Sequence, residues 1–260
     1  VRGFSDLGFS YVYVIFDEGT DLYWARSRVL EYMQQISGKL PEGVTPTLGP
    51  DATGVGWVYQ YAVIDKSGKY DLAYLRTLQD WFLRYQLASV EGVAEVASIG
   101  GFVKQYQVNI DPNKLAAYRI SIKDVMERIR MSNNDVEGRL LEFAGREYMV
   151  RGRGYIKSIK DIEEISLGSF NGAPISIKDV AKVNLGPEMR RGIVELNGEG
   201  ETVGGIVVMR QGENALNVIN RVKEKLKEIE PSLPEGVKVE AVYDRSQLIQ
   251  ASITNLKDTL

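Results

Sequence analysis

The hydrophobic positions of the chain follow two different periods. Apolar residues spaced three or four apart predict amphipathic helices, and alternating or continuous β-branched runs predict strands. Helical stripes comprise Leu22, Ala25, Val29, Met33 and Ile36; Leu72, Leu75, Leu78, Phe82 and Tyr85; Ile122, Val125, Met126 and Ile129; and Ala215, Ile219, Val222, Leu226 and Ile229. Strands are predicted at 57–64, 93–99, 102–110, 148–150, 174–177 and 180–185. The mixture predicts an α+β protein.

Two segments repeat at an offset of 193 residues, the difference between Gly19 and Gly212. Each segment starts with an apolar strand, passes through its glycine and a helix, and ends on Leu-Pro-Glu-Gly-Val before the next strand. The two strands are 11–16 and 205–209, and the two closing motifs are 40–44 and 233–237. The shared spacing predicts one strand–helix–strand unit that is used twice.

From residue 55 the predicted order is strand, helix, strand, strand, helix. A strand after residue 199 would complete a split βαβ (ferredoxin-like) sandwich, with helices on one face of an antiparallel sheet. Gly100-Gly101 predicts a hairpin between the strands at 93–99 and 102–110. The region 135–198 is rich in glycine and charge and has short strands, so it is predicted to be an inserted β-rich subdomain.

These patterns predict four parts. They are an incomplete subdomain at 1–54 that lacks its opening strand and helix, a second subdomain at 55–134 and 199–245, the insertion at 135–198, and an amphipathic helix at 246–260 with Ile249, Ile253, Leu256 and Leu260 on one face. The chain opens on Val1 rather than methionine. We therefore expect it to be a piece of a longer protein. Ile-Ser-Ile-Lys-Asp-Val occurs at 120–125, where it starts a helix, and at 175–180, where strand spacing follows. We interpret it as recurring capping chemistry.

Composition excludes several classes of function. A net charge of -3 argues against a nucleic-acid-binding protein, which has a strongly basic face. The chain contains neither Cys nor His, so disulfides, thiolate chemistry and histidine bases are excluded. No apolar run reaches the roughly 18 residues of a membrane span. No nucleophile elbow or phosphate-binding loop occurs, and the acid pairs are typical of solvated surface. We predict no enzyme activity, no catalytic residue and no bound cofactor.

Methionine is the remaining source of metal chemistry, because a thioether binds Cu(I) or Ag(I) well and Zn(II) or Mg(II) poorly. Met33, Met126 and Met209 are predicted to lie in the core, Met149 in a strand and Met131 at an exposed helix end. Met189 differs, because it lies among charges in Gly186-Pro187-Glu188-Met189-Arg190-Arg191-Gly192. The residues alone leave two interpretations of Met189 open, packing and a soft-metal ligand.

Several stretches together resemble the first periplasmic portion of the heavy-metal efflux pumps of the resistance-nodulation-division family, in their copper/silver branch. The resemblance covers nearly the whole chain and is specific. It is carried by 10–16, 23–32, 49–57, 93–98, 147–151, 186–192 and 243–248.

The resemblance implies a proton-driven, trimeric antiporter of the inner membrane, with this segment in the periplasm. Residues 1–54 would be most of the first porter subdomain, 55–134 and 199–245 the second, 135–198 the docking subdomain, and 246–260 a helix leading toward a membrane span. Partners would be the rest of the pump chain, its homotrimer, a periplasmic adaptor and an outer-membrane channel, without nucleic acid. Met189 matches a relay methionine that passes Cu(I) or Ag(I) onward. The main three-methionine site and the proton path lie outside this chain.

Two alternatives stay open at this point. The chain could be a structural trimer and partner-docking fragment of a divalent-cation (Zn, Co, Cd) pump of the same family, in which Met189 only packs. It could also be an unrelated split-βαβ module that binds a small molecule. A buried Met189 would favour the first alternative, and a closed first sheet would favour the second.

Overall fold

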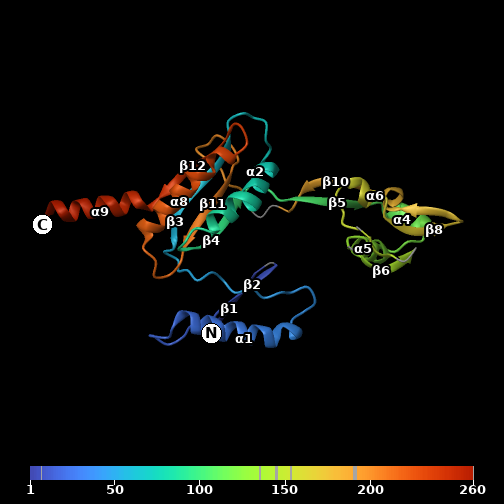
Figure 1. The fold of residues 1–260 in the computed structure, drawn as a ribbon, viewed down its shortest axis with the longest axis horizontal. Coiled ribbons are helices and arrows are strands. Elements are labelled where there is room, and N and C mark those ends of the chain that lie inside the picture. Colours follow the sequence, from blue (N-terminus) through green and yellow to red (C-terminus); the bar gives the residue numbers. More distant parts are fainter. Residues whose placement is uncertain (7, 135, 144–145, 153, 190–191, 260) are drawn as a thin grey trace. The chain divides into compact units, whose positions relative to one another are not determined.

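The structure is a computed structural model that describes residues 1–6, 8–134, 136–143, 146–152, 154–189 and 192–259, with the backbone alone at 136–143 and 146–152. The chain divides into two compact units (Figure 1). The first unit contains residues 1–69, 78–99 and 202–260, and the second contains 70–77 and 100–201. The four subdomain boundaries predicted from the sequence lie at other positions and stay a prediction.

A four-stranded sheet in the first unit has the order β12-β3-β11-β4, and β3 pairs antiparallel with both of its neighbours. In chain order the elements alternate as strand, helix, strand, strand, helix, strand. This is the split βαβ arrangement, so the predicted fold class is confirmed. Its membership differs from the prediction, because β11, α8 and β12 take the places expected for the strand at 102–110, the helix at 122–129 and one final strand after residue 199. The elements are β3 Trp57–Asp65, α2 Leu72–Leu78, η2 Gln79–Leu83, α3 Arg84–Ala88, β4 Val93–Gly100, β11 Val203–Met209, α8 Ala215–Ile229 and β12 Val237–Asp244.

The helix between β3 and β4 contains one π-helical turn, η2. The extra residue of a π turn rotates every later position around the helix axis. The predicted stripe continued through Phe82 and Tyr85, but Tyr85 is exposed and this part of the prediction is wrong. The buried positions are Ala73, Leu75, Gln79, Leu83 and Leu87.

The buried amide of Gln79 is held by two hydrogen bonds. The Tyr61 hydroxyl donates to Gln79 Oε1 at 2.9 Å, and Gln79 Nε2 donates to Ser98 Oγ at 3.3 Å. The Tyr61 ring lies over Gly205 of β11, where a β-carbon would overlap the ring. Burial raises the pKa of the Tyr61 hydroxyl, so this group stays a neutral donor. Glycine at position 205 therefore gives Tyr61 the space to reach Gln79.

The helix, the 3₁₀ turn after it and the closing turn of the predicted repeat are present in both copies in the first unit. Helix α1, Leu22–Ile36, and helix α8 begin and end at equivalent positions, and each is followed by one 3₁₀ turn, η1 Ser37–Lys39 or η3 Glu230–Ser232. Each helix also has an N-cap side chain, Asp21 or Asn214, that accepts from the backbone N–H three residues on. The glycines of the two closing motifs have matching φ values of 84° and 87°.

The two copies differ in what covers them. Helix α8 buries Val218, Ile219, Val222 and Ile229, whereas α1 buries only Ala25. The strands that accompany α1 are a two-stranded antiparallel hairpin, β1 Arg2–Asp6 and β2 Phe9–Tyr13, and residues 44–50 form no strand. The predicted strand at 11–16 is therefore displaced to β2. Since two strands alone rarely form a stable sheet, the first copy is structurally incomplete in this chain.

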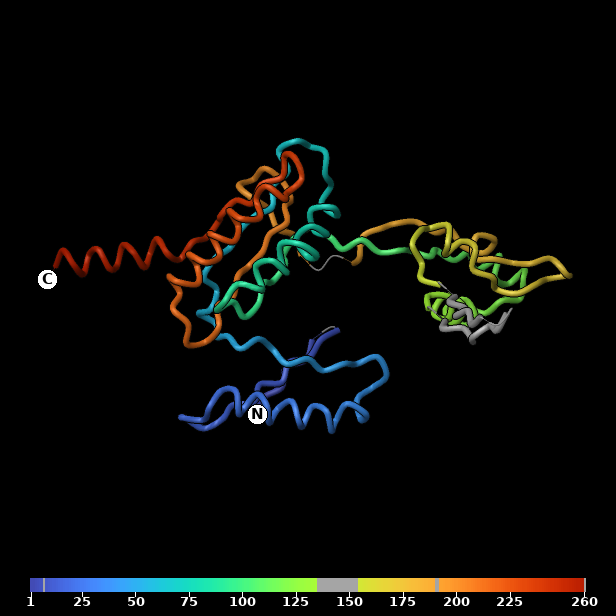
Figure 2. Tube along the Cα trace, in the orientation of Figure 1, coloured from blue at the N-terminus to red at the C-terminus, as the bar shows by residue number. Residues whose placement is uncertain are grey.

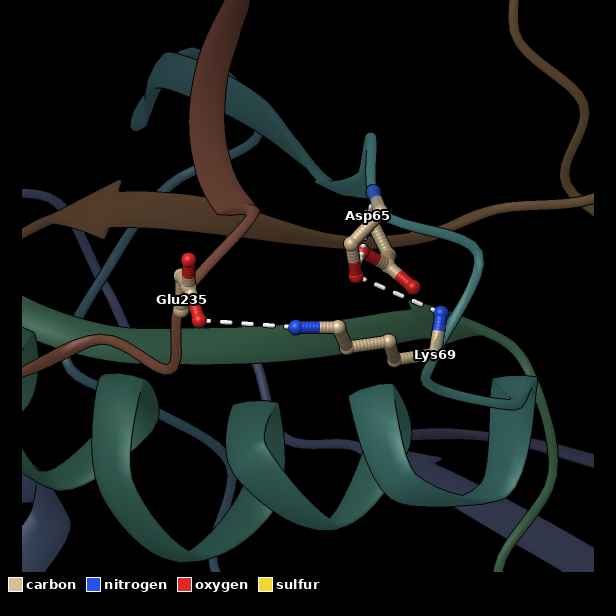
Figure 3. A network of polar contacts seen from close by, with 4 residues as sticks. Asp65, Lys69 and Glu235 are labelled. Atoms are coloured by element: carbon tan, nitrogen blue, oxygen red, sulfur yellow. Dashed lines mark hydrogen bonds and ion pairs between the residues drawn. The ribbon is translucent and has the colours of Figure 1, made fainter.

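The closing motif of the second copy is held by the turn after β3 (Figure 3). Lys69 Nζ lies 3.4 Å from a carboxylate oxygen of Glu235, and the Lys66 N–H donates to the Gly236 carbonyl at 2.9 Å. A β-carbon at Gly236 would overlap Ser67. Around Gly43, the equivalent glycine of the first copy, no atom lies within 4 Å of a β-carbon position.

The hairpin predicted around Gly100-Gly101 is wrong. Strand β4 pairs with β11, and β5, Lys104–Ile110, pairs with β10, Ala181–Pro187, in the second unit. Both glycines have positive φ, so the chain turns there without returning along β4. The ribbon of β5 and β10 can be followed in Figure 2.

Three helices of the second unit begin with the same four residues, Ser-Ile-Lys-Asp. In each, a capping box joins the serine and the aspartate, at Ser121/Asp124, Ser158/Asp161 and Ser176/Asp179. The predicted capping chemistry is therefore present. The copy at 175–180 also starts a short helix, and the strand spacing expected after it corresponds to β10. The elements are α4 Pro112–Tyr118, α5 Ile122–Met131, β6 Val136–Phe143, β7 Arg146–Gly152, α6 Ile159–Glu163, β8 Ser166–Phe170, β9 Ala173–Ser176 and α7 Ile177–Val180.

The apolar core of the second unit lies between these helices and strands. It comprises Leu115, Val125, Ile162, Ile165, Leu167, Ile175, Ile177, Val180 and Val183. The residue that follows each capping-box aspartate, Val125, Ile162 or Val180, is buried. The boxes therefore determine both where these helices start and which side chain of each enters the core.

Helix α9, Arg245–Thr259, follows β12 without a linker (Figure 2). Of its predicted apolar face, Ile253 and Leu256 are exposed and Ile249 is partly buried, and Leu260 lies outside the described residues. No helix among the described residues combines the length and the hydrophobicity of a membrane span.

Candidate metal-relay site

Met189, the predicted soft-metal ligand, lies two residues beyond the end of β10. Strand β10 is paired with β5 as far as Pro187, which is opposite Lys104. One further hydrogen bond, from the Glu188 N–H to the Val103 carbonyl at 2.9 Å, extends the pairing past the end of the strand. Met189 is therefore the first residue after this anchored stretch.

Two side-chain amides hold the carbonyl of Pro187. Gln107 Nε2 donates to this oxygen at 3.0 Å and Gln105 Nε2 donates at 3.3 Å. Proline adds a restricted φ of its own. The backbone leading to Met189 is thus restrained by one main-chain and two side-chain hydrogen bonds.

The Met189 side chain is 85% exposed. A side chain with this exposure does not pack against the described residues of this chain, so packing within the chain is not observed. Its sulfur is open to an incoming ion, whereas the neighbouring Arg190 and Arg191 lie outside the described residues. The role of Met189 as a metal ligand stays a prediction.

One thioether cannot hold a metal ion firmly by itself. The part of the chain that the structure describes contains no group of three or more acidic side chains that could hold a cation instead. The candidate site that the structure describes is therefore the thioether of Met189.

The other methionines fall into three groups. Met33 and Met209 are partly buried, in agreement with packing, and Met131 is 70% exposed as predicted. Met126 was expected in the core but is exposed, because Val125 occupies the buried position of α5. Met149 lies in strand β7, and its side chain is outside the described part of the chain.

The amides of Gln105 and Gln107 were not singled out from the sequence. A signal was present, since Gln105, Gln107 and Asn109 alternate with Tyr106, Val108 and Ile110 along one strand. Such alternation predicts one polar face of a strand. The partner of that face, residues 184–187, lies more than 70 positions further along the chain, and no local pattern connects the two.

Comparison with known proteins shows which family the chain matches. The model of the AcrB/AcrD/AcrF family matches residues 1–260. The chain is 59% identical to the cation efflux system protein CusA of Escherichia coli K12 and 56% identical to the putative cation efflux system protein SilA of Salmonella typhimurium. It is 40% identical to the cobalt-zinc-cadmium resistance protein CzcA of Cupriavidus metallidurans. All three alignments cover the whole chain and 25% of the relative, so the chain spans about a quarter of these relatives.

Solved structures agree with this result. A crystal structure of a heavy metal efflux pump superposes with a TM-score of 0.82 at 31% identity, over 95% of this chain and 24% of the pump chain. A second crystal form gives the same TM-score. From the family match over the full length, the shared split βαβ fold and the identity to these efflux proteins, the chain belongs to the AcrB/AcrD/AcrF family, among its heavy-metal efflux members.

Proposed function

We propose that this chain is the periplasmic porter and docking part of a proton-driven inner-membrane pump that exports Cu(I) and Ag(I). Met189 is a transient ligand on the path of the ion. The observation that carries the proposal is a thioether that is 85% exposed at the end of an anchored strand, in a chain 59% identical to a cation efflux protein. A single soft donor binds weakly enough to release the ion again, where a closed four-ligand site would retain it.

Identity to relatives supports the choice of branch. The chain is 56–59% identical to CusA and SilA but 36% identical to the nickel-cobalt-cadmium resistance protein NccA. The resemblance described above assigns methionine at this loop to the copper/silver pumps. Softness of sulfur gives the physical reason, because Zn(II) and Co(II) prefer nitrogen and oxygen donors or thiolates.

The subdomain assignment is part of the proposal. Residues 1–54 are most of the first porter subdomain, 55–134 and 199–245 the second, 135–198 the docking subdomain, and 246–260 the approach to a membrane span. The repeat supports the first two, because α1 and α8 occupy equivalent positions in copies of one unit. The exposed apolar positions of α9 support the last, since a helix continuing into lipid needs no protein cover there.

Partners follow from the same proposal. The remainder of a pump chain, two further copies of it, a periplasmic adaptor and an outer-membrane channel would surround this segment. The incomplete first copy of the repeat supports the first of these, because α1 buries only Ala25 and needs a further strand and helix to cover it. Proton transfer and the main metal site belong to parts outside this chain.

Of the two alternatives, the unrelated split-βαβ module is wrong, because the chain belongs to the efflux family. A divalent-cation pump is the second candidate function, and 40% identity to CzcA supports it less than 59% identity to CusA supports the first.

A chimera tests the function. This chain would replace the matching quarter of E. coli CusA in a strain that lacks its own copy, and tolerance to Ag(I), Cu(I), Zn(II), Co(II) and Cd(II) would be measured. We expect tolerance to Ag(I) and Cu(I) to return, to fall with Met189→Ala, and to survive Met131→Ala, which removes another exposed methionine. Tolerance to Zn(II), Co(II) or Cd(II) alone would overturn the proposal in favour of the divalent alternative.

A further inference from the structure

A continuous row of side-chain amides runs along one face of the β5–β10 ribbon and ends at the Pro187 carbonyl, two residues before Met189. Asn109 Nδ2 donates to Asn184 Oδ1 at 2.7 Å, and Asn184 Nδ2 donates to Gln107 Oε1 at 3.3 Å. Gln107 Nε2 then donates to the Pro187 carbonyl at 3.0 Å. We define Asn109, Asn184 and Gln107 as the amide row. Each amide in it donates to the next acceptor, so the three side chains orient one another.

The last step of the row depends on two neighbours. A β-carbon at Gly186 would overlap the Gln107 amide, so glycine there lets the side chain reach across β10. Gln105 Nε2 donates to the same carbonyl at 3.3 Å from the next position on this face. The Pro187 carbonyl is therefore held from two directions, two residues before the exposed sulfur of Met189.

The chemistry of the row suits a passage for a soft cation. Amides are neutral at every pH, so they restrain the backbone without adding a second carboxylate to that of Glu188, which directly precedes Met189. Further carboxylates would favour hard cations, which prefer oxygen ligands. The groups that touch the Pro187 carbonyl thus add rigidity without adding a competing ligand.

We propose that Gln107, supported by Gln105 and by the rest of the amide row, is a positioning residue for the Met189 thioether. This inference rests on the proposed function of Met189. By restraining residues 186–188, Gln107 places the sulfur in advance of the ion, so less conformational entropy is lost when the ion is bound. Gln107 itself does not touch the ion.

The test uses the 260-residue chain with ¹³C-methyl methionine, titrated with silver nitrate in chloride-free buffer. The methyl signal of Met189 reports the site, and that of Met131, exposed on another element, is the internal reference. Gln107→Leu removes the amide at similar size. We expect Ag(I) affinity at Met189 to fall about threefold to tenfold, the size of effect that loss of one hydrogen bond produces, with Met131 unchanged. The Met189 methyl signal of the free variant should also move toward the position of a disordered methionine.

A merely structural role of Gln107 predicts a different outcome. Gln107→Leu would then lower the unfolding midpoint of the second unit while leaving the Met189 signal and its Ag(I) affinity unchanged, and this result would overturn the inference. Gln107→Glu serves as the matched variant, because it can still accept from Asn184 but cannot donate to Pro187 when ionised. Gln107→Glu should move the Met189 methyl signal toward the position of a disordered methionine, as Gln107→Leu does.

Two further variants keep the inference separate from the proposed function. If Met189→Ala binds Ag(I) as the wild type does, the function of Met189 fails whatever Gln107 does. If Met189→Ala weakens binding and Gln107→Leu does not, only the positioning role fails. Should Gln107→Leu not fold, Gln105→Ala removes the other donor at an exposed residue and must change the Met189 signal in the same direction.

Discussion

Lys223 on α8 forms an ion pair with Asp244, the last residue of β12, at the start of α9. Lys223 Nζ also donates to Ser246 Oγ at 3.0 Å, and the Ser246 N–H donates to Asp244 at 2.9 Å. Arg245 donates to the Val55 carbonyl at 2.6 Å. The start of α9 is therefore fastened to α8 through Asp244 and Ser246, and to Val55, just before β3, through Arg245.

Replacing Lys223 should loosen this junction. Burial alone would raise the pKa of the Asp244 carboxyl, but hydrogen bonds from Lys223 and Ser246 outweigh it and lower that pKa. Lys223→Met removes the cation and leaves a carboxylate with 10% exposure short of one partner. We expect the free energy of unfolding of the first unit to fall by about 1–2 kcal/mol.

Urea unfolding followed by tryptophan fluorescence measures this change, because Trp24, Trp57 and Trp81 all lie in the first unit. Lys227→Met, at an exposed position of the same helix, is the control and should change stability by less than about 0.5 kcal/mol. Equal stability of the two variants would show that the ion pair at the junction contributes nothing.

Acid should weaken the second unit through its three capping boxes. Hydrogen bonds lower the pKa of each aspartate, first from the Ser121 hydroxyl for Asp124, the Lys157 N–H for Asp161 and the Ser176 N–H for Asp179. An aspartate whose pKa is lower in the folded state than in the unfolded chain stabilises the folded state at every pH above the ordinary aspartate pKa of about 4. That stability is lost as the pH falls through the lowered value.

The methyl signals of Ile162, Ile175 and Val180 report unfolding of the second unit as a function of pH. We expect the urea midpoint to be flat above pH 5 and to fall below pH 4. Asp179→Asn should lower the urea midpoint above pH 5, and the midpoint of this variant should fall less steeply below pH 4. An acid limb of the same depth in this variant would mean that the box at Ser176 does not contribute to it.

Gly205 should not accept a side chain. A β-carbon at this position meets the Tyr61 ring, which is itself held by Gln79. Gly205→Ala forces the ring or the strand to move, and overpacking of this kind costs about 1–3 kcal/mol. Tryptophan fluorescence in urea measures the loss. Gly54→Ala, where no atom lies within 4 Å of the new carbon, is the matched control. A loss of similar size in both variants would contradict the assigned role of Gly205.

Local patterns predicted much of the fold. The repeat located α1 and α8 in one register, because glycine spacing, helical periodicity and a Leu-Pro-Glu-Gly-Val motif are all properties of short segments. The split βαβ class was predicted from the strand and helix periods, although the prediction placed the strand at 102–110 and the helix at 122–129 in the sheet instead of β11 and α8. The capping chemistry at Ser121 and Ser176 was predicted for the same reason.

The failures have physical causes of a different kind. The π turn at Gln79–Leu83 shifts the buried face of its helix, and hydrophobic spacing does not reveal where a helix gains a residue. Strand β5 pairs with β10 rather than with β4, since two glycines of positive φ redirect the chain instead of closing a hairpin. The amide row was missed for the same reason, because its members meet only through that long-range pairing.

The most direct measurement is an Ag(I) titration of the chain, followed by the methyl signals of its six methionines. The account predicts that Met189 responds first and saturably, that Met189→Ala removes the tightest binding step, and that Met131→Ala leaves this step intact. Identical Ag(I) binding by the wild type and Met189→Ala, with the Met189 signal unmoved, would contradict the claim that this exposed sulfur lies on the path of the ion.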